Sequence, residues 1–142
     1  MSRPRYLLDT NTVSNLLHQR SGFESIVDAL DGLAYGDVLV SAITLSELHT
    51  MAAKAANPEA KSRALALVML RFSVPAFDES AALHAGLIRA WLEPRGLRIG
   101  PMDTLIAAHA RSLGCVVVTD NMEEFARVPE LRVENWFQRP SS

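Results

Sequence analysis

The sequence predicts an α/β fold, namely a three-layer α/β/α domain around a central, mostly parallel sheet. Three short apolar runs, at 6–8, 38–41 and 115–118, have the composition of strands buried on both faces. Helical patterns follow these runs, and such alternation is typical of parallel sheets. The length of 142 residues suits one domain, covering 1–142, with a substantial core.

Composition narrows the class of protein. The single cysteine, Cys115, excludes an internal disulfide framework and a cysteine-rich zinc site, and it suits a reducing compartment. No signal peptide is expected before Tyr6. The longest apolar runs, such as 64–70, are far shorter than the ~20 residues that a bilayer span requires. We therefore expect a soluble, cytoplasmic protein without a membrane segment.

The net charge of −2 differs from the basic balance of most nucleic-acid-binding proteins. Its distribution matters more than its sum. If four of the 16 acidic residues occupy one site, the rest of the chain carries 14 basic and 12 acidic residues, a balance of +2. Twelve of the basic residues are arginines, which suit bidentate contacts to phosphate. A mildly basic surface around an acidic site is compatible with RNA.

After the strand at 6–8, the N-terminal half is predicted to contain four helices and a second strand. Asn11 is expected to cap the first helix. Asn57-Pro58 separates the third helix from the fourth, and these two are expected to pair as an antiparallel hairpin. Apolar periodicity and turn residues predict helices at 12–19, 24–30, 44–56 and 59–72, and a strand at 38–41.

The C-terminal half is predicted to hold two longer helices and the remaining strands. Asp78 or Glu79 opens a helix that Pro94 stops. Gly100-Pro101 places proline in the first turn of the next helix, where its missing N–H costs nothing. The other predicted elements are a short strand at 74–77, a buried strand at 115–118, a helical turn at 123–126, a weak edge strand at 131–134 and a tail at 139–142.

Four acidic residues occupy equivalent places in this pattern. Asp9 and Asp120 directly follow buried strands, while Glu47 and Asp103 stand near the starts of helices. Because parallel strands end at one edge of a sheet and the following helices begin there, these acids can converge on one crevice. Clustered carboxylates repel one another unless a cation lies between them. Oxygen-only ligation suits Mg²⁺ or Mn²⁺, which can promote phosphoryl transfer.

Each acid also has a purely structural interpretation. Asp103 is a favourable charge at a helix N-terminus, Glu47 a solvated helix residue, and Asp9 and Asp120 helix caps. This interpretation is weaker for Asp9 and Asp120, because each ends a run too apolar for a surface. The joint placement of the four acids favours a metal site.

Four segments carry these acids: LDTN at 8–11, SAITLSEL at 41–48, PMDTLIA at 101–107 and VTDNMEEF at 118–125. They resemble the four motifs of PIN-domain nucleases, most closely the VapC toxins of VapBC toxin–antitoxin systems. The resemblance covers essentially the whole chain, including VENW at 133–136. It implies a PIN-like fold, Mg²⁺- or Mn²⁺-dependent endoribonuclease activity, homodimerisation and inhibition by a small cognate VapB-like antitoxin.

The resemblance also assigns roles to residues. Asp9, Glu47 and Asp103 match the family's metal-binding acids. The fourth acid of the family stands at the position of either Asp120 or Asn121, and we assign Asp120 as the ligand. Asn11, Thr119 and Asn121 are expected to be hydrogen-bonding neighbours. The implied reaction is a hydrolysis without a protein nucleophile, in which a metal-bound water attacks phosphorus and leaves a 5′ phosphate and a 3′ hydroxyl. Which RNA is cut stays open.

Two other functions compete with this interpretation. A haloacid-dehalogenase-like phosphohydrolase also begins with an aspartate after its first strand, but its pattern requires a second aspartate where this chain has Asn11. It also requires a late lysine, as a receiver domain does, and Lys54 and Lys61 are the only lysines. The competitor from another class is a PIN-like module that binds RNA or protein without catalysis. Retention of all four acids argues against it.

Other chemistry-bearing residues are assigned smaller roles. The histidines at 18, 49, 84 and 109 lie on different predicted helices, so a paired acid and base is disfavoured. Cys115 and the two tryptophans, at 91 and 136, are expected to pack. The arginines at 89, 95 and 98 either contact RNA phosphates or remain solvated. The hairpin at 44–72, with its alanine-rich stretches, is the expected docking groove for the antitoxin.

Overall fold

A four-stranded parallel sheet forms the centre of the molecule. The computed structural model describes residues 3–138, so the expected tail at 139–142 lies outside the described residues. The strand order is β2-β1-β3-β4, and Leu7 of β1 pairs with Leu39 on one side and Val117 on the other. The predicted parallel sheet is confirmed, with strands β1 (Tyr6–Leu8), β2 (Val38–Val40), β3 (Val116–Val118) and β4 (Val133–Glu134).

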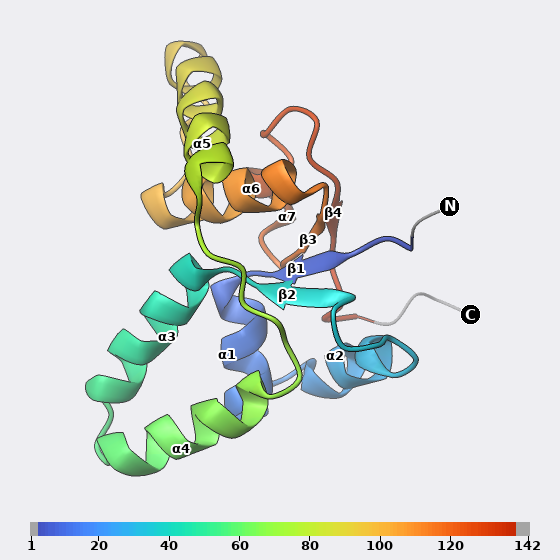
Figure 1. Cartoon of the computed structure of the whole chain (residues 1–142), viewed down its shortest axis with the longest axis vertical. Helices are drawn as coiled ribbons and strands as arrows, with labels where there is room; N and C mark the ends of the chain where they lie inside the picture. Colours follow the sequence, from blue (N-terminus) through green and yellow to red (C-terminus); the bar gives the residue numbers. More distant parts are fainter. Residues whose placement is uncertain (1–2, 139–142) are drawn as a thin grey trace.

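Helices cover both faces of this sheet (Figure 1). On one face lie α5 (Glu79–Leu92), α6 (Pro101–Leu113) and α7 (Met122–Phe125), with the short 3₁₀ turn η1 (Glu93–Arg95) after α5. On the other lie α1 (Thr10–His18), α2 (Phe23–Leu30), α3 (Ala42–Ala53) and α4 (Pro58–Met69). This is the predicted three-layer α/β/α arrangement.

Two apolar clusters fill the spaces between the layers. Successive strand residues point to opposite faces. Leu7 therefore packs with the α5 and α6 side chains, and Leu8 packs with those of α1 to α4. The valines of β3 divide in the same way: Val117 joins the first cluster and Val118 the second. Burial on both faces explains why the strands are continuous apolar runs.

The helices that follow β1 and β2 begin earlier than predicted. The cap of α1 is Asp9, not Asn11, because the Asp9 carboxylate accepts a hydrogen bond from the backbone N–H of Thr12. Ser41 caps α3 in the same manner by accepting from the N–H of Ile43 at 3.1 Å. Each cap directly follows its strand, so the chain turns into the helix at the edge of the sheet.

The segment at 74–77 does not form the predicted strand. It leads into α5 and contains Pro75, which has no N–H to donate to a sheet. Pairing is limited here to an isolated parallel bridge between Leu39 and Ser73, in which the Val40 N–H donates to the Ser73 carbonyl at 3.0 Å. The other predicted elements are present within a few residues of their expected bounds, and α3 and α4 contact each other across residues 54–57.

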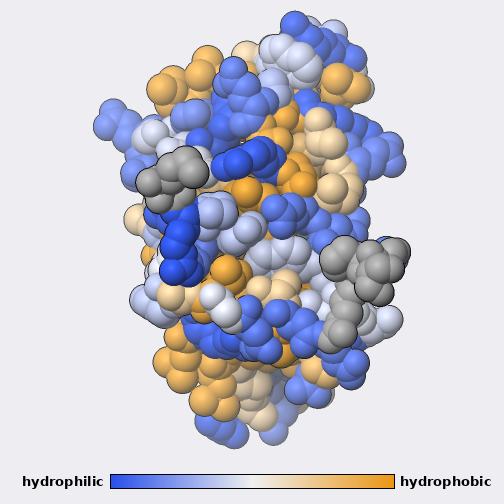
Figure 2. Space-filling view, turned by 90° about the vertical axis from the view of Figure 1, so that its right-hand side faces the viewer, coloured by the Kyte–Doolittle hydropathy of each residue, from blue (hydrophilic) through white to orange (hydrophobic). Residues whose placement is uncertain are grey.

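Both hydrophilic and apolar residues are exposed on the side of the molecule from which β1 starts. Figure 2 shows this side, where hydrophilic residues alternate with smaller apolar areas. The carboxyl ends of the strands point to the opposite side, towards the starts of α1 and α3 (Figure 1). Across residues 3–138 every helix is too short or too polar to cross a bilayer.

Candidate active site

Asp9 is the most buried of the four predicted acids. Only 4% of its surface is exposed. Its Oδ1 accepts hydrogen bonds from the N–H and the hydroxyl of Thr12, at 2.9 and 2.6 Å, and its Oδ2 accepts one from the Thr119 hydroxyl at 2.6 Å. Burial raises the pKa of Asp9 more than these bonds lower it, and the charge of Asp120 adds to the increase. All three donors are neutral, so they orient the carboxylate without neutralising it.

Thr119 joins two parts of the site, as expected for a supporting residue. It directly follows β3, and while its hydroxyl donates to Asp9 it also accepts a hydrogen bond from the N–H of Asn121 at 2.9 Å. The Asp9 N–H donates to the Val118 carbonyl at 3.0 Å. The ends of β1 and β3 are therefore fixed to each other at the position of the buried carboxylate.

Glu47 reaches the site from α3 through a threonine of α1. Its Oε1 accepts a hydrogen bond from the Thr10 hydroxyl at 2.5 Å, and the Thr44 hydroxyl lies 3.4 Å from that of Thr10. The sequence predicted Glu47 near the start of its helix. Because α3 begins at Ala42, Glu47 instead stands in the second turn. A longer side chain is therefore needed there to reach back to the sheet edge.

Asp103 stands in the first turn of α6, as predicted, and the charges of the other acids act on its carboxylate. It is half-buried. Burial, followed by the charges of Asp9, Glu124 and Glu47, raises the pKa of Asp103 from 3.8 to about 6. Asp9 and Asp103 are 94 positions apart in the sequence, yet their charges repel each other across one site.

Asp120 occupies the exposed rim of the site. Its Oδ1 accepts a hydrogen bond from the Asn11 side-chain amide at 3.0 Å, which joins the start of α1 to the end of β3. Asn121 instead points its amide at Glu124 Oε2, 2.6 Å away. Asp120 and Asn121 therefore form hydrogen bonds with different residues, Asn11 and Glu124. The predicted supporting residues Asn11, Thr119 and Asn121 all hydrogen-bond within this cluster.

Comparison with known proteins identifies the family. The model of the PIN domain matches residues 6–131. The tRNA(fMet)-specific endonuclease VapC of Salmonella typhimurium is 39% identical over 132 residues, which cover 93% of this chain and 98% of the relative. The chain belongs to the VapC family of PIN-domain proteins. Ribonuclease VapC2 of Haemophilus influenzae is 38% identical with the same coverage of both chains.

A solved structure of another VapC protein has the same fold. The structure of DNA-bound VapBC from Salmonella typhimurium aligns with a TM-score of 0.84 and 36% identity, covering 94% of this chain and 99% of that one. The expected PIN-like architecture is therefore confirmed. The family match also removes the haloacid-dehalogenase-like alternative.

Several residues of this PIN-domain site were not predicted from the sequence. Glu124 of α7 acts on Asp103 through its charge, although the sequence pattern assigned it no role. Its signal was the start of that turn at the carboxyl end of β3, which is the edge where the other acids gather. Thr10 and Thr12 had no signal beyond their position next to Asp9.

The acids have the chemistry of a site for a hard divalent cation. Their side chains offer only oxygen. The charges of Asp9, Glu124 and Glu47 add to burial in raising the pKa of Asp103, and a cation would relieve that repulsion. Within residues 3–138, no three Asp, Glu, His or Cys side chains form a ready-made ligand set. Glu47 and Asp103 are only half-buried, so an ion can reach both side chains from solvent.

The remaining candidate residues stand apart from the acids. His109 is fully buried in α6, where its Nδ1 lies 2.7 Å from the Ser41 Oγ. Cys115 is buried in the core, and burial raises the pKa of its thiol. Trp136 is buried against Tyr6, with ring centroids 5.0 Å apart, as expected for a packing residue. The four histidines lie on four different helices, α1, α3, α5 and α6.

Proposed function

We propose that this VapC-family protein is a metal-dependent endoribonuclease that hydrolyses RNA phosphodiester bonds at the site around Asp9. The observation that carries this proposal is the convergence of Asp9, Glu47 and Asp103 from three different elements. Burial, followed by the charges of Asp9, Glu124 and Glu47, raises the pKa of Asp103 to about 6. The curated relatives are named as an endonuclease and a ribonuclease, in agreement with this chemistry.

Mg²⁺ or Mn²⁺ is the proposed cofactor, with Asp9, Glu47, Asp103 and Asp120 as its ligands. Such an ion, when bound, offsets charge on the phosphate and activates water for attack. Thr12 and Thr119 keep the Asp9 carboxylate in one orientation, and Thr10 directs Glu47 towards the same edge. These hydroxyls therefore preorganise two of the four acids.

The products follow from hydrolysis without a protein nucleophile. The oxygen of water bonds to phosphorus, the bond from phosphorus to the 3′ oxygen breaks, and that oxygen takes up a proton. The cut leaves a 5′ phosphate and a 3′ hydroxyl. A paired-histidine route through the 2′ hydroxyl is not supported, because His109 is buried against Ser41 and the other histidines lie on separate helices.

We further propose that the protein is the toxin of a toxin–antitoxin pair, because its fold is similar to the solved VapBC structures from Salmonella typhimurium and nontypeable Haemophilus influenzae. The hairpin of α3 and α4 supports a docking site for the antitoxin. A groove of about 550 Å³ lies between α1 and this hairpin, with Met51, Ala60 and Ala64 among its lining residues.

The protein is also proposed to form a homodimer. Leu83 and Leu87 form an exposed apolar stripe on α5, and this stripe is the proposed contact between the two copies.

The decisive experiment compares cleavage and binding of single-stranded RNA. Wild-type protein should cut in Mg²⁺ or Mn²⁺, stop in excess EDTA and recover when metal is restored. Asp103→Asn should bind RNA without cutting it. Asp31→Asn, which removes one exposed acid at the end of α2, is the matched control and should cut normally. Binding without cleavage by the wild type in either metal would support the non-catalytic module instead.

A further inference from the structure

A second pocket lies beside Asp103, between the end of α5 and the first turn of α6. Its volume is about 310 Å³, close to the lower end of the roughly 300–1,000 Å³ typical of ligand pockets. Ile99 and Pro101 line this pocket, and Gly100 between them is close to the acidic site, since a Cβ built on this glycine would lie 3.7 Å from Asp103 Oδ2. A ligand in this pocket would therefore sit next to the proposed catalytic acids.

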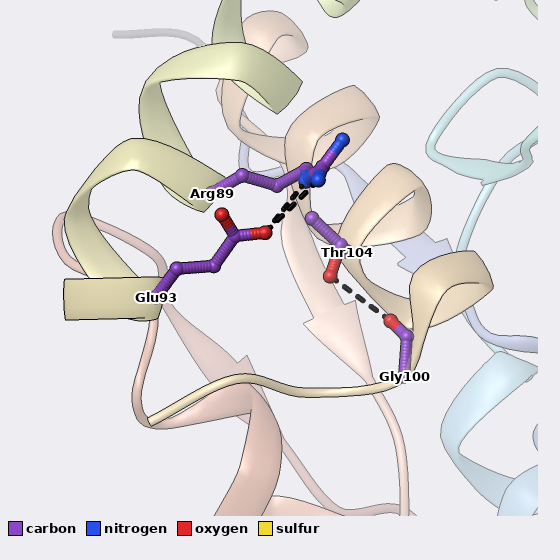
Figure 3. Close-up of polar contacts among 4 residues, drawn as sticks. All are labelled: Arg89, Glu93, Gly100 and Thr104. Carbon is purple, nitrogen blue, oxygen red and sulfur yellow. Dashed lines mark hydrogen bonds and ion pairs between the residues drawn. The ribbon is translucent and has the colours of Figure 1, made fainter. Parts of the chain in front are cut away.

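The floor of the pocket is apolar and its rim is charged. Leu92 and Ile99 are buried, and Leu105 completes the apolar surface. Arg89 and Glu93 project from the end of α5 towards Gly100 and Thr104 of the facing turn (Figure 3). The lining residues are therefore suited to a small flat ring with a polar edge.

The rim groups remain able to bind a ligand. Glu93 Oε1 accepts two hydrogen bonds from Arg89, at 2.9 and 3.1 Å, in an exposed ion pair that contributes little stability and can rearrange. Arg98 is exposed at the rim. Thr104 is less available, because its hydroxyl already donates to the Gly100 carbonyl at 2.9 Å.

Resting on the proposed ribonuclease function, we propose that this pocket binds one unstacked nucleobase of the RNA next to the bond that is cut. The apolar floor accepts the ring, the guanidinium planes of Arg89 and Arg98 offer stacking surfaces, and the Glu93 carboxylate accepts from an N–H on the base edge. Arginine is in excess around the rim and favours binding of the phosphates that flank the base. Arg95 is nearby, with its guanidinium carbon 4.1 Å from the centroid of the Trp91 ring.

The test is the base composition around the cut sites in an RNA of random sequence. Wild-type protein in Mg²⁺ or Mn²⁺ should prefer particular bases at one position next to the cut. Glu93→Gln and Arg98→Gln should weaken this preference about tenfold at that position only. Matched controls are Glu59→Gln and Arg63→Gln, two exposed substitutions on α4 with the same charge changes, and they should leave the preference intact.

Three outcomes would overturn the proposal. One is an unchanged base preference at every position in both pocket variants. Another is a shift from dimer to monomer in sedimentation of the pocket variants, since the pocket would then be an interface between copies of the chain. The last is normal base preference with lost inhibition by the antitoxin, which would assign the pocket to that protein. Absence of cleavage by the wild type would instead contradict the proposed function.

Discussion

The Thr119 hydroxyl donates a hydrogen bond of 2.6 Å to Asp9 Oδ2, joining two residues that are 110 positions apart in the sequence. Both are almost completely buried, and each directly follows a central strand. The orientation of the Asp9 carboxylate therefore depends on the register between β1 and β3. A sheet edge of this kind can hold a functional carboxylate in place without a cationic partner.

Loss of this hydrogen bond should impair both stability and cleavage. Thr119→Val keeps the shape of the side chain but leaves Asp9 Oδ2 buried without its donor. The unfolding free energy should fall by about 1–3 kcal/mol, as for other unsatisfied buried groups. Thr119→Ser keeps the hydroxyl and should lose less than half as much, with cleavage largely retained. Denaturant unfolding and initial cleavage rates measure both effects, and equal losses in the two variants would argue against an orienting role.

Asp103 should make the metal-free protein less stable as the pH rises. Its folded pKa of about 6 exceeds its usual 3.8, so folding takes up a proton between these values. The charged Asp103 carboxylate lowers the free energy of unfolding. This loss is absent below pH 3.8, develops as the pH rises to about 6 and is complete above that pH. Because Asp103 is only half-buried, solvent reduces the effect to about 1 kcal/mol.

Asp103→Asn removes this penalty. In EDTA, the variant should therefore gain stability relative to the wild type as the pH rises from 4 to 7. Urea unfolding of both proteins across that range measures the difference. A difference that stays constant with pH would show that burial and the neighbouring acids do not raise the pKa of Asp103.

Ser41 and His109 should be coupled in stability. The Ser41 hydroxyl caps α3 and contacts His109 Nδ1, while the other ring nitrogen is buried without a well-formed hydrogen bond. Ser41→Ala should cost about 2 kcal/mol through the lost cap and the unsatisfied ring. Adding His109→Leu should cost much less in the Ser41→Ala background than in the wild type. A double-mutant cycle measures this coupling, and strictly additive losses would refute it.

Much of the fold was predictable because its strands are buried on both faces. Such strands are continuous apolar runs, and the helices between them carry clear turn residues. The starts of α1 and α3 were placed two residues late, because Asp9 and Ser41 are caps that follow a strand without any loop. The segment at 74–77 was wrong as a strand because apolar residues beside a sheet resemble paired ones, and the lack of pairing depends on distant residues.

The site was predictable where position in the chain implies position in space. Asp9, Asp103 and Asp120 follow strands or open helices, so the topology alone brings them to one edge. Glu124 was missed, since its long side chain reaches the site from a helical turn that looks solvent-exposed. The hydroxyls of Thr10 and Thr12 were missed too, because threonine in a first helical turn is common for purely local reasons.

The central claim is that the carboxylate of Asp9 binds a catalytic cation, and Asp9→Asn tests it most directly. Asparagine caps a helix nearly as well as aspartate, so the variant should fold with unchanged or higher stability in EDTA. For the wild type, added Mg²⁺ or Mn²⁺ should start RNA cleavage and raise the melting temperature, because the folded chain binds the ion and the unfolded chain does not. The variant should lose cleavage and most of the melting shift. Wild-type cleavage with an unchanged melting shift in Asp9→Asn would contradict the metal site.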